Sequence, residues 1–378
     1  MFFTYFEQNK ISRKESNRLF FELLENPNID ISEYKPEERK WKKVTRNIDL
    51  IYGHNYYGKH PIHPSYFKLM LMPPIALDEI PEHYYSFKIP KKTNPTKMRE
   101  IDAPDAILKN YQTIGKNFIE EYLKVQPHNA AHAYVKGRST ITAVKTHQKN
   151  QSKWFLKLDL KDFFPSHNEE YILKMLSKIY PFAVLPSSQM FYIEILVKYA
   201  LLNNKLPQGT PLSPLLTNLC MVPIDFMITN TLSNFQRKHL VYTRYADDLL
   251  ISCKYKFKPG PVITAINKIF RHYNAPFYIN KEKTRFGSSA GRNWNLGIML
   301  NKDNNMTIGH KNNQKFRAMI YDLICNGDTW TIEKAQESMG LISYYKAIEP
   351  DYITYTINKY NSKYNTDIMK KLKSIIAK

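Results

Sequence analysis

Residues 243–252, TRYADDLLIS, set two adjacent aspartates in a run of apolar residues that otherwise predicts a buried β-strand. Asp247 and Asp248 have two explanations. They form the polar turn of a β-hairpin, or they bring charge into the protein interior for chemistry. A buried carboxylate without a partner is costly, so the second explanation requires a cation beside the pair.

A third aspartate has a similar setting about 90 residues earlier. Asp159 interrupts the apolar run WFLKLDLKDFFPS (154–166), although any one such aspartate is more often an ordinary strand end or turn. Three carboxylates gathered from separate strands repel one another unless cations lie between them, and hard oxygen ligands favour Mg²⁺. Two Mg²⁺ ions ~3.5 to 4 Å apart, with Mn²⁺ as the alternative ion, suit phosphoryl or nucleotidyl transfer.

The composition is that of a folded protein with a polyanionic partner. The 378 residues are 43% hydrophobic, which excludes a disordered chain, and they carry a net charge of +21. This surplus favours nucleic acid, although an AT-rich genome also produces a lysine-rich chain. The three cysteines predict neither a zinc site nor a disulfide framework. No run approaches the ~18 apolar residues of a membrane span, so we expect a cytoplasmic protein without a membrane partner.

Periodicity predicts mixed α and β elements. Alternation predicts a hairpin over 84–104 with basic residues at its tip. Helical spacing predicts a helix over 107–123, and its repeating apolar residues are Ile107, Tyr111, Ile114, Phe118 and Tyr122. Ser166 is expected to cap a helix over 166–180, and residues 215–232 are expected to form one long apolar helix. From about residue 312 the chain reads as mostly helical.

Seven segments, in this order, resemble the reverse transcriptase family, most closely its bacterial group II intron-like and retron-like branch. They are KMREIDAPD (97–105), AHAYVKGRST (131–140), FLKLDLKDFFPS (155–166), LPQGTPLSPLLTNL (206–219), RYADDLLIS (244–252), INKEKTRF (279–286) and NLGIMLN (295–301). The resemblance implies an α+β right-hand polymerase with an antiparallel palm sheet, a helical thumb and RNA-directed DNA synthesis. The implied divisions are an N-terminal extension (1–85), fingers (86–154), a palm (155–305) to which about 168–205 add part of the fingers, and the thumb (306–378).

The resemblance assigns the catalytic and metal-binding residues. Asp159, Asp247 and Asp248 match the catalytic triad, and the backbone carbonyl of Leu160 would complete the metal shell. Asp247 is expected to be a firmer metal ligand than Asp248. Lys283 matches the lysine that protonates the leaving pyrophosphate, although INKEKTRF contains two other basic residues that compete for this role.

Further matches concern the incoming nucleotide. Lys97 and Arg99 match the cations of the fingers that grip the triphosphate, with a solvated hairpin tip as the alternative. Gln208 and Gly209 match the loop that lies against the nucleotide. Phe164 matches the aromatic steric gate that selects dNTPs, with a plain core phenylalanine as the alternative.

The remaining matches concern nucleic acid. Lys136 and Arg138 are expected to contact template or nucleotide phosphate, and Tyr245 is expected to pack near the primer end. The predicted primer grip contains Asn295, Leu296 and Gly297. The implied partners are an RNA template in the form of a structured noncoding RNA, a DNA product and dNTPs. An effector protein or a second copy of the chain is a further expected partner.

Two departures from the family pattern bear on the biological role. The stretch WNLGIML (294–300) lacks the Val-Thr-Gly triplet that retron enzymes carry, and Ser213-Pro214 replaces the Ser-Gln of diversity-generating enzymes. These departures favour a stand-alone enzyme that copies a noncoding RNA in antiphage defence. Three alternatives stay open: a template-independent or protein-primed DNA polymerase, a retron reverse transcriptase, and a non-catalytic RNA-binding scaffold. The basic run RKWKK (39–43) favours RNA binding by the extension.

Overall fold

The structure, a computed structural model, describes residues 75–377 other than 92–93, 186, 234, 236–237, 290–293 and 295–296. The chain forms two compact units, each assembled from segments that are distant in the sequence. Of the described residues, the first unit contains 75–131, 160–228 and 266–278, and the second contains 132–159, 229–265 and 279–377. Most of the predicted N-terminal extension (1–85), including the basic run at 39–43, lies outside the described residues. The predicted division into fingers, palm and thumb stays a prediction.

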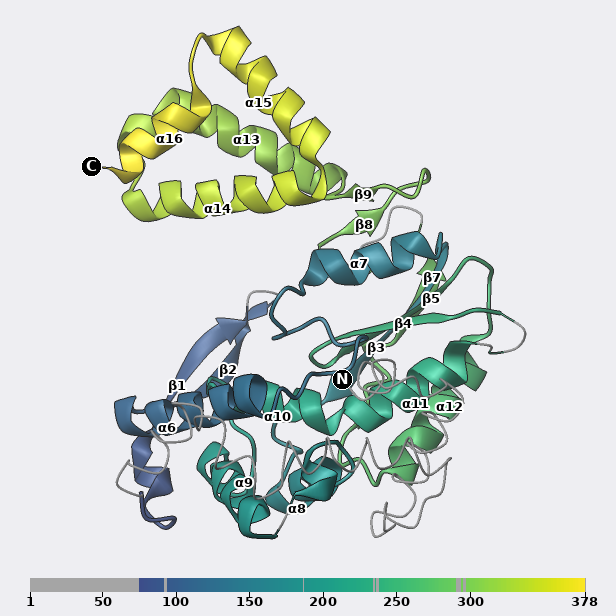
Figure 1. Cartoon of the computed structure of the whole chain (residues 1–378). Coiled ribbons are helices and arrows are strands. Elements are labelled where there is room, and N and C mark those ends of the chain that lie inside the picture. The colour runs from purple at the N-terminus through teal and green to yellow at the C-terminus, as the bar shows by residue number, and fades with distance from the viewer. Residues whose placement is uncertain are drawn as a thin grey trace, which may run out of the picture. The chain divides into compact units, whose positions relative to one another are not determined.

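The first unit contains a β-hairpin and most of the helices from the first two thirds of the chain (Figure 1). Strands β1 (Tyr84–Lys91) and β2 (Asn94–Pro104) pair antiparallel, as predicted for 84–104. The helices of this unit are α6 (Ala106–Asn117), α8 (Glu169–Leu176), α9 (Ser187–Ala200), α10 (Ser213–Cys220), the first part of α11 (Val222–Ser233) and the second part of α12 (Pro259–His272). Short helical turns are η1 (Ile80–His83), η2 (Phe118–Tyr122) and η3 (Phe182–Val184).

The buried face of α6 differs from the predicted face at one residue, in the first turn of the helix. Asp105 caps the helix by accepting a hydrogen bond from the backbone N of Leu108 at 2.8 Å. In the first turn Leu108 is fully buried, whereas Ile107 is 54% exposed. The prediction that Ile107 belongs to the apolar face was therefore wrong, because the face begins one residue later. Tyr111, Ile114 and Phe118 are buried as expected.

Two other local predictions were wrong for identifiable reasons. Helix α8 is capped by Asn168, whose Oδ1 accepts from the backbone N of Tyr171 at 2.9 Å, while Ser166 Oγ donates to the carbonyl of Asp162. The helix expected over 215–232 is a pair, α10 and α11, bent by 43° around Met221. Pro223 has no N–H to donate and therefore favours a new helix start at this point. Among the described residues no single helix is long and apolar enough to span a membrane, and α10 with α11 passes that test only as this bent pair.

The second unit is built on a sheet that carries the predicted aspartates. Its central strands run in the order β4 (Val241–Tyr245), β5 (Asp248–Cys253), β3 (Trp154–Lys161) and β6 (Tyr278–Ile279), and β7 (Arg285–Ser288) also pairs with β3. Strand β3 pairs antiparallel with β5 and with β7, so its backbone is bonded on both sides. The strands predicted around 154–161 and 243–252 are confirmed.

The C-terminal part of the second unit is helical, as predicted. Helix α7 (Thr140–Lys149) precedes β3 in the chain. A small hairpin of β8 (Met299–Leu300) and β9 (Met306–Thr307) leads into the C-terminal helices. These are α13 (His310–Asn326), η4 (Gly327–Thr329), α14 (Ile332–Ile348), α15 (Pro350–Tyr364) and α16 (Ile368–Ile376). One apolar core joins these helices to the sheet. In that core Trp294 stacks on Phe155 of β3 with ring centroids 5.6 Å apart, and Tyr345 packs on Phe316.

Candidate active site

The aspartate pair lies at the turn of the β4–β5 hairpin. Tyr245 pairs with Asp248, so Ala246 and Asp247 form a two-residue turn. Ala246 has a φ of 55°, a left-handed conformation that is uncommon for residues other than glycine and asparagine, and its carbonyl accepts from the guanidinium of Arg244 at 3.2 Å. Arg244 is almost completely buried. Backbone strain held in place by a buried arginine indicates a turn built to present its aspartates.

A buried polar network holds the same hairpin from behind. His147 of α7 hydrogen-bonds to Thr243 of β4 at 2.7 Å and to Ser252 of β5 at 2.6 Å, and Ser252 Oγ donates to Ser152 Oγ. Burial lowers the pKa of His147 to about 3, so the imidazole is neutral at physiological pH. A shift of one residue in a β-hairpin reverses the faces of its side chains, and these bonds favour a single register. Leu249 of β5 is fully buried and anchors the strand in the core.

The strand register brings the distant aspartate to the pair. Asp159 of β3 lies directly opposite Asp248 of β5. Side chains in such positions have Cβ atoms ~4.5 to 5.5 Å apart, and like charges placed there destabilise a sheet. Asp159 is 7% exposed, so water screens this repulsion poorly. The sequence prediction that the three aspartates gather in one place is borne out for this pair by register and for Asp247 by adjacency.

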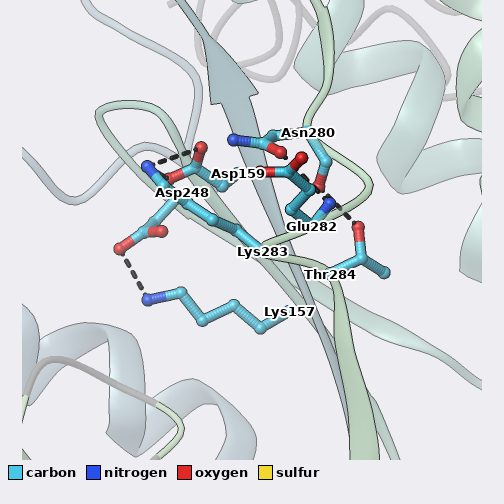
Figure 2. A network of polar contacts seen from close by, with 7 residues as sticks. All are labelled: Lys157, Asp159, Asp248, Asn280, Glu282, Lys283 and Thr284. Atoms are coloured by element: carbon cyan, nitrogen blue, oxygen red, sulfur yellow. Dashed lines mark hydrogen bonds and ion pairs between the residues drawn. The ribbon is translucent and has the colours of Figure 1, made fainter.

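Two lysines compensate the opposed carboxylates (Figure 2). Lys283 Nζ lies 2.9 Å from Asp159 Oδ1 and 3.1 Å from Oδ2, and Lys157 Nζ lies 2.8 Å from Asp248 Oδ2. Each carboxylate therefore has its own ammonium group. Lys157 was missed in the sequence analysis, although its position two residues before Asp159 places both side chains on one face of the strand.

The turn that carries Lys283 is folded around Asn280. The backbone N of Asn280 donates to the carbonyl of Asp159 at 2.8 Å, its Oδ1 accepts from the backbone N of Glu282, and its carbonyl accepts from Thr284 Oγ1 at 2.9 Å (Figure 2). These bonds attach the segment 280–284 to the end of β3. They explain why Lys283, of the three basic residues in INKEKTRF, is the one bonded to Asp159.

Asp247 has the least compensated charge of the three. Within the described part of the chain no lysine or arginine makes an ion pair with its carboxylate. Burial raises the pKa of Asp247 above its ordinary value, and the negative charges of Asp248 and Asp159 raise it further. The pKa of Lys283 is raised, first by its hydrogen bond to Asp159. The site thus holds one poorly solvated carboxylate beside two that are paired with lysines.

The donor chemistry of the site fits Mg²⁺ or Mn²⁺, because three carboxylates supply the hard oxygen ligands that these ions prefer. The side-chain orientations are different from those of a ready-made metal site. Among the described residues no group of three or more His, Cys, Asp or Glu side chains converges on one point that would hold an ion. Asp159 and Asp248 instead turn their oxygens toward lysines. A metal that took Asp159 as a ligand would have to replace Lys283 there.

Several predicted nucleotide contacts belong to the first unit. Gln208 accepts a hydrogen bond through its carbonyl from the backbone N of Asp102 in β2 at 3.1 Å. Gly209 has a φ of 114°, and a Cβ at this position would lie 2.7 Å from Cγ2 of Ile101. This loop therefore needs glycine in order to approach β2. Arg99 is exposed on β2, and Leu160 is buried just after Asp159.

Lys97 also lies on β2.

Two adjacent phenylalanines of the first unit, Phe163 and Phe164, differ in their burial. Phe163 is 4% exposed and packs against Phe277 and His167, so it is a core residue. Phe164 is only partly buried, with its ring edge-on to Phe163 at 5.8 Å between centroids. The steric-gate role of Phe164 stays a prediction.

The predicted nucleic-acid contacts are not tested by the geometry. Lys136 is exposed, and Arg138 is half-buried with a pKa lowered by that burial. Tyr245 is half-buried at the end of β4. Gly297, with a φ of 105°, precedes β8, while Asn295 and Leu296 lie outside the described residues. These assignments stay predictions.

Comparisons with known proteins agree with the site. The model of the family "Reverse transcriptase (RNA-dependent DNA polymerase)" matches residues 89–321, a range that contains all three aspartates and both lysines. The chain is 28% identical over 279 residues to the retron Ec73 reverse transcriptase of Escherichia coli, covering 72% of this chain and 87% of the relative. It is 29% identical over 287 residues to the retron Mx65 reverse transcriptase of Myxococcus xanthus, covering 71% of this chain and 62% of the relative.

A solved structure is also similar at a greater distance. Telomerase from Candida albicans, in complex with a fragment of telomeric RNA, shares 13% identity with this chain and covers 90% of it, with 66% of the telomerase chain covered. The TM-score of 0.43 makes this a remote resemblance.

Proposed function

The chain belongs to the reverse transcriptase family of RNA-directed DNA polymerases, and from this premise we propose that it copies a dedicated noncoding RNA into DNA by two-metal nucleotidyl transfer. The fold class follows the same family: an α+β right-hand polymerase with antiparallel sheets and a helical C-terminal part. The observation that carries the proposal is the placement of Asp159 directly opposite Asp248, with Asp247 at the adjoining turn. A binding scaffold has no use for such a strained charge cluster.

In this proposal the reaction joins a primer 3′-hydroxyl to the α-phosphorus of a dNTP and breaks the bond to pyrophosphate. Two Mg²⁺ ions, or Mn²⁺ in their place, would lower the pKa of the hydroxyl and stabilise the leaving oxygen. Asp159 and Asp247 would be the main ligands, with the carbonyl of Leu160 in support and Asp248 in a lesser role. Lys283, released from Asp159, would donate its proton to the departing pyrophosphate.

The relatives favour retron-type DNA synthesis over the stand-alone role that the missing Val-Thr-Gly triplet predicted. A three-residue signature is weaker evidence than similarity over 279 residues to an enzyme named as a retron reverse transcriptase. We retain antiphage defence, a cytoplasmic location and an effector protein or second copy as partner as parts of the proposal. The RNA template and DNA product follow from the family.

Primer extension tests the proposed function. The wild-type protein is given an RNA template of known sequence, a paired DNA primer and one dNTP at a time, and we expect extension only by the complementary dNTP. Asp247→Asn should reduce the rate ~100-fold or more, because it removes a metal ligand, and Asp248→Asn should reduce it less. Extension by any dNTP would favour the template-independent alternative. Tight RNA binding without extension would favour the scaffold.

Sugar selection tests the role of Phe164. Phe164→Val should raise incorporation of ribonucleotides relative to deoxyribonucleotides by ~10- to 100-fold, because the ring no longer excludes a 2′-hydroxyl. The ratio of kcat/KM for matched rNTP and dNTP measures this effect. Phe163→Val is the control and should lower thermal stability without changing the ratio, because Phe163 is a core residue. An unchanged ratio in Phe164→Val would return this residue to a structural role.

A further inference from the structure

Lys157 makes an ion pair that the strand register builds into the site. Its neighbour across β5 is Leu250, while Asp248 lies opposite Asp159, so Lys157 and Asp248 occupy diagonal positions on one face. Diagonal Cα atoms in antiparallel strands are ~7 to 8 Å apart, which a lysine spans easily. Because β3 is bonded on both sides, the root of Lys157 cannot move away from the carboxylate. The 2.8 Å contact is therefore a fixed feature of the sheet.

The two lysines of the site differ in their freedom. The Lys283 side chain is 63% exposed and comes from a turn, whereas the Lys157 side chain is 24% exposed and comes from the central strand. Lys283 can swing into solvent when another cation takes Asp159. Lys157 would have to abandon a half-buried carboxylate that faces a second carboxylate, which is costly. The geometry thus distinguishes an exchangeable counter-ion from a permanent one.

We propose that Lys157 is a positioning residue that holds Asp248 as an auxiliary ligand and, as a permanent positive charge beside the cluster, weakens the binding of Mg²⁺. This inference rests on the proposed two-metal function and deepens it. Lys157 keeps Asp248 Oδ2 occupied, so the metals take Asp159 and Asp247 first. It also allows the opposed carboxylates to coexist when Lys283 has left. The unequal roles of the two adjacent aspartates then have a structural cause.

The charge balance supports this division of roles. Asp159, Asp247 and Asp248 carry three negative charges, which the two lysines reduce to a net charge of minus one. If a divalent ion were to replace Lys283, Lys157 would keep its positive charge on the neighbouring carboxylate of Asp248. The ammonium group and the ion would then repel each other, and at an effective dielectric constant of ~20 we expect this repulsion to weaken metal binding ~10-fold. A lysine with only a structural role would not act on the metal.

A Mg²⁺ titration of thermal stability tests the inference. The variant is Lys157→Met, which keeps most of the length of the side chain and removes its charge. We expect the half-saturating Mg²⁺ concentration, read from the rise in Tm, to fall ~10-fold, because the repulsion between Lys157 and the ion is gone. The Tm without Mg²⁺ should be lower than that of the wild type, and saturating Mg²⁺ should restore most of it. The optimal Mg²⁺ concentration for primer extension should fall in parallel.

Two matched variants control for other effects. Lys153→Met removes the same charge from an exposed position just before β3 and should leave the Mg²⁺ titration unchanged. Lys157→Arg keeps the charge and should titrate near the wild-type Mg²⁺ concentration even if Lys157→Met folds poorly. An equal loss of Tm in Lys157→Met with and without Mg²⁺, at an unchanged half-saturating concentration, would overturn the inference while the wild type still extends primers. Absence of any Mg²⁺ response in the wild type would overturn both the inference and the proposed metal site.

Discussion

Asp247→Asn is expected to raise the Tm of the protein in Mg²⁺-free buffer while it abolishes DNA synthesis. Burial and the charges of Asp248 and Asp159 hold the pKa of Asp247 above its ordinary value. The folded state therefore binds this proton more tightly than the unfolded chain does. The resulting stabilisation is complete below the unfolded pKa of ~3.9 and is lost as the pH rises through the folded pKa. At pH 7 the ionised carboxylate opposes folding, and a neutral amide of the same size relieves that opposition.

The partial exposure of Asp247 limits the gain in stability that we expect from Asp247→Asn. Asp247 is half-buried, so solvent screens part of the repulsion, and we expect a gain of ~1 kcal/mol, or a rise in Tm of ~2 °C. Differential scanning fluorimetry at pH 7 with EDTA measures it. Added Mg²⁺ should raise the Tm of the wild type, because it binds only the folded state, and should have much less effect on Asp247→Asn.

Asp248→Asn is the matched control for this experiment. It makes the same chemical change one residue later, but it removes the partner of Lys157 and leaves a half-buried ammonium unpaired. Its Tm without Mg²⁺ should therefore fall. A fall in Tm for Asp247→Asn as well would mean that its carboxylate is stabilised by contacts that the structure does not contain among the described residues.

Gly209→Ala is expected to destabilise the first unit by ~2 to 4 kcal/mol, the sum of a disfavoured backbone and an overpacked contact. The φ of 114° is unfavourable for alanine, and its Cβ would lie 2.7 Å from Cγ2 of Ile101 and 3.3 Å from the carbonyl O of Asp102. The carbonyl belongs to a strand and cannot move aside easily. Urea unfolding followed by circular dichroism measures the loss, and the KM for dNTPs should rise if the loop lies against the nucleotide.

Gly297→Ala separates the two contributions. Gly297 has a similar φ of 105°, but its Cβ would meet no atom of the described residues within 4 Å. The Gly297→Ala variant should therefore lower the free energy of unfolding only by the backbone contribution of ~1 to 2 kcal/mol. Equal losses in the two variants would show that the contact of Gly209 with β2 has no energetic weight.

Runs of apolar residues were sufficient to predict the strands of the site. Asp159 and Asp247 interrupt apolar runs that only a sheet buries, and the family resemblance supplied the expectation that these runs meet. The structure adds the register, which places Asp159 opposite Asp248. Register depends on side-chain packing such as the bonds of His147 to two strands, and a single sequence does not display that packing.

The features that were missed depend on tertiary contacts. Lys157 has the sequence pattern of an ordinary exposed strand lysine, and its role becomes visible only when β5 lies beside it. The cap at Asn168 lies two residues after the predicted cap at Ser166, where competing polar residues made the boundary ambiguous. The break at Met221 was not predicted, although Pro223 follows it closely. Ile107 fits the helical repeat, but the helix buries the neighbouring Leu108. Tertiary packing determines which of two neighbouring residues is buried.

The most direct test of RNA-templated DNA synthesis at this carboxylate cluster is to sequence the nucleic acid that copurifies with the protein. The wild-type protein and Asp247→Asn are expressed in the same cells, and both the RNA and the DNA that they retain are sequenced. The account predicts one dominant noncoding RNA in both samples, and DNA complementary to it in the wild type alone. DNA that matches no retained RNA, or complementary DNA that persists in Asp247→Asn, would contradict it.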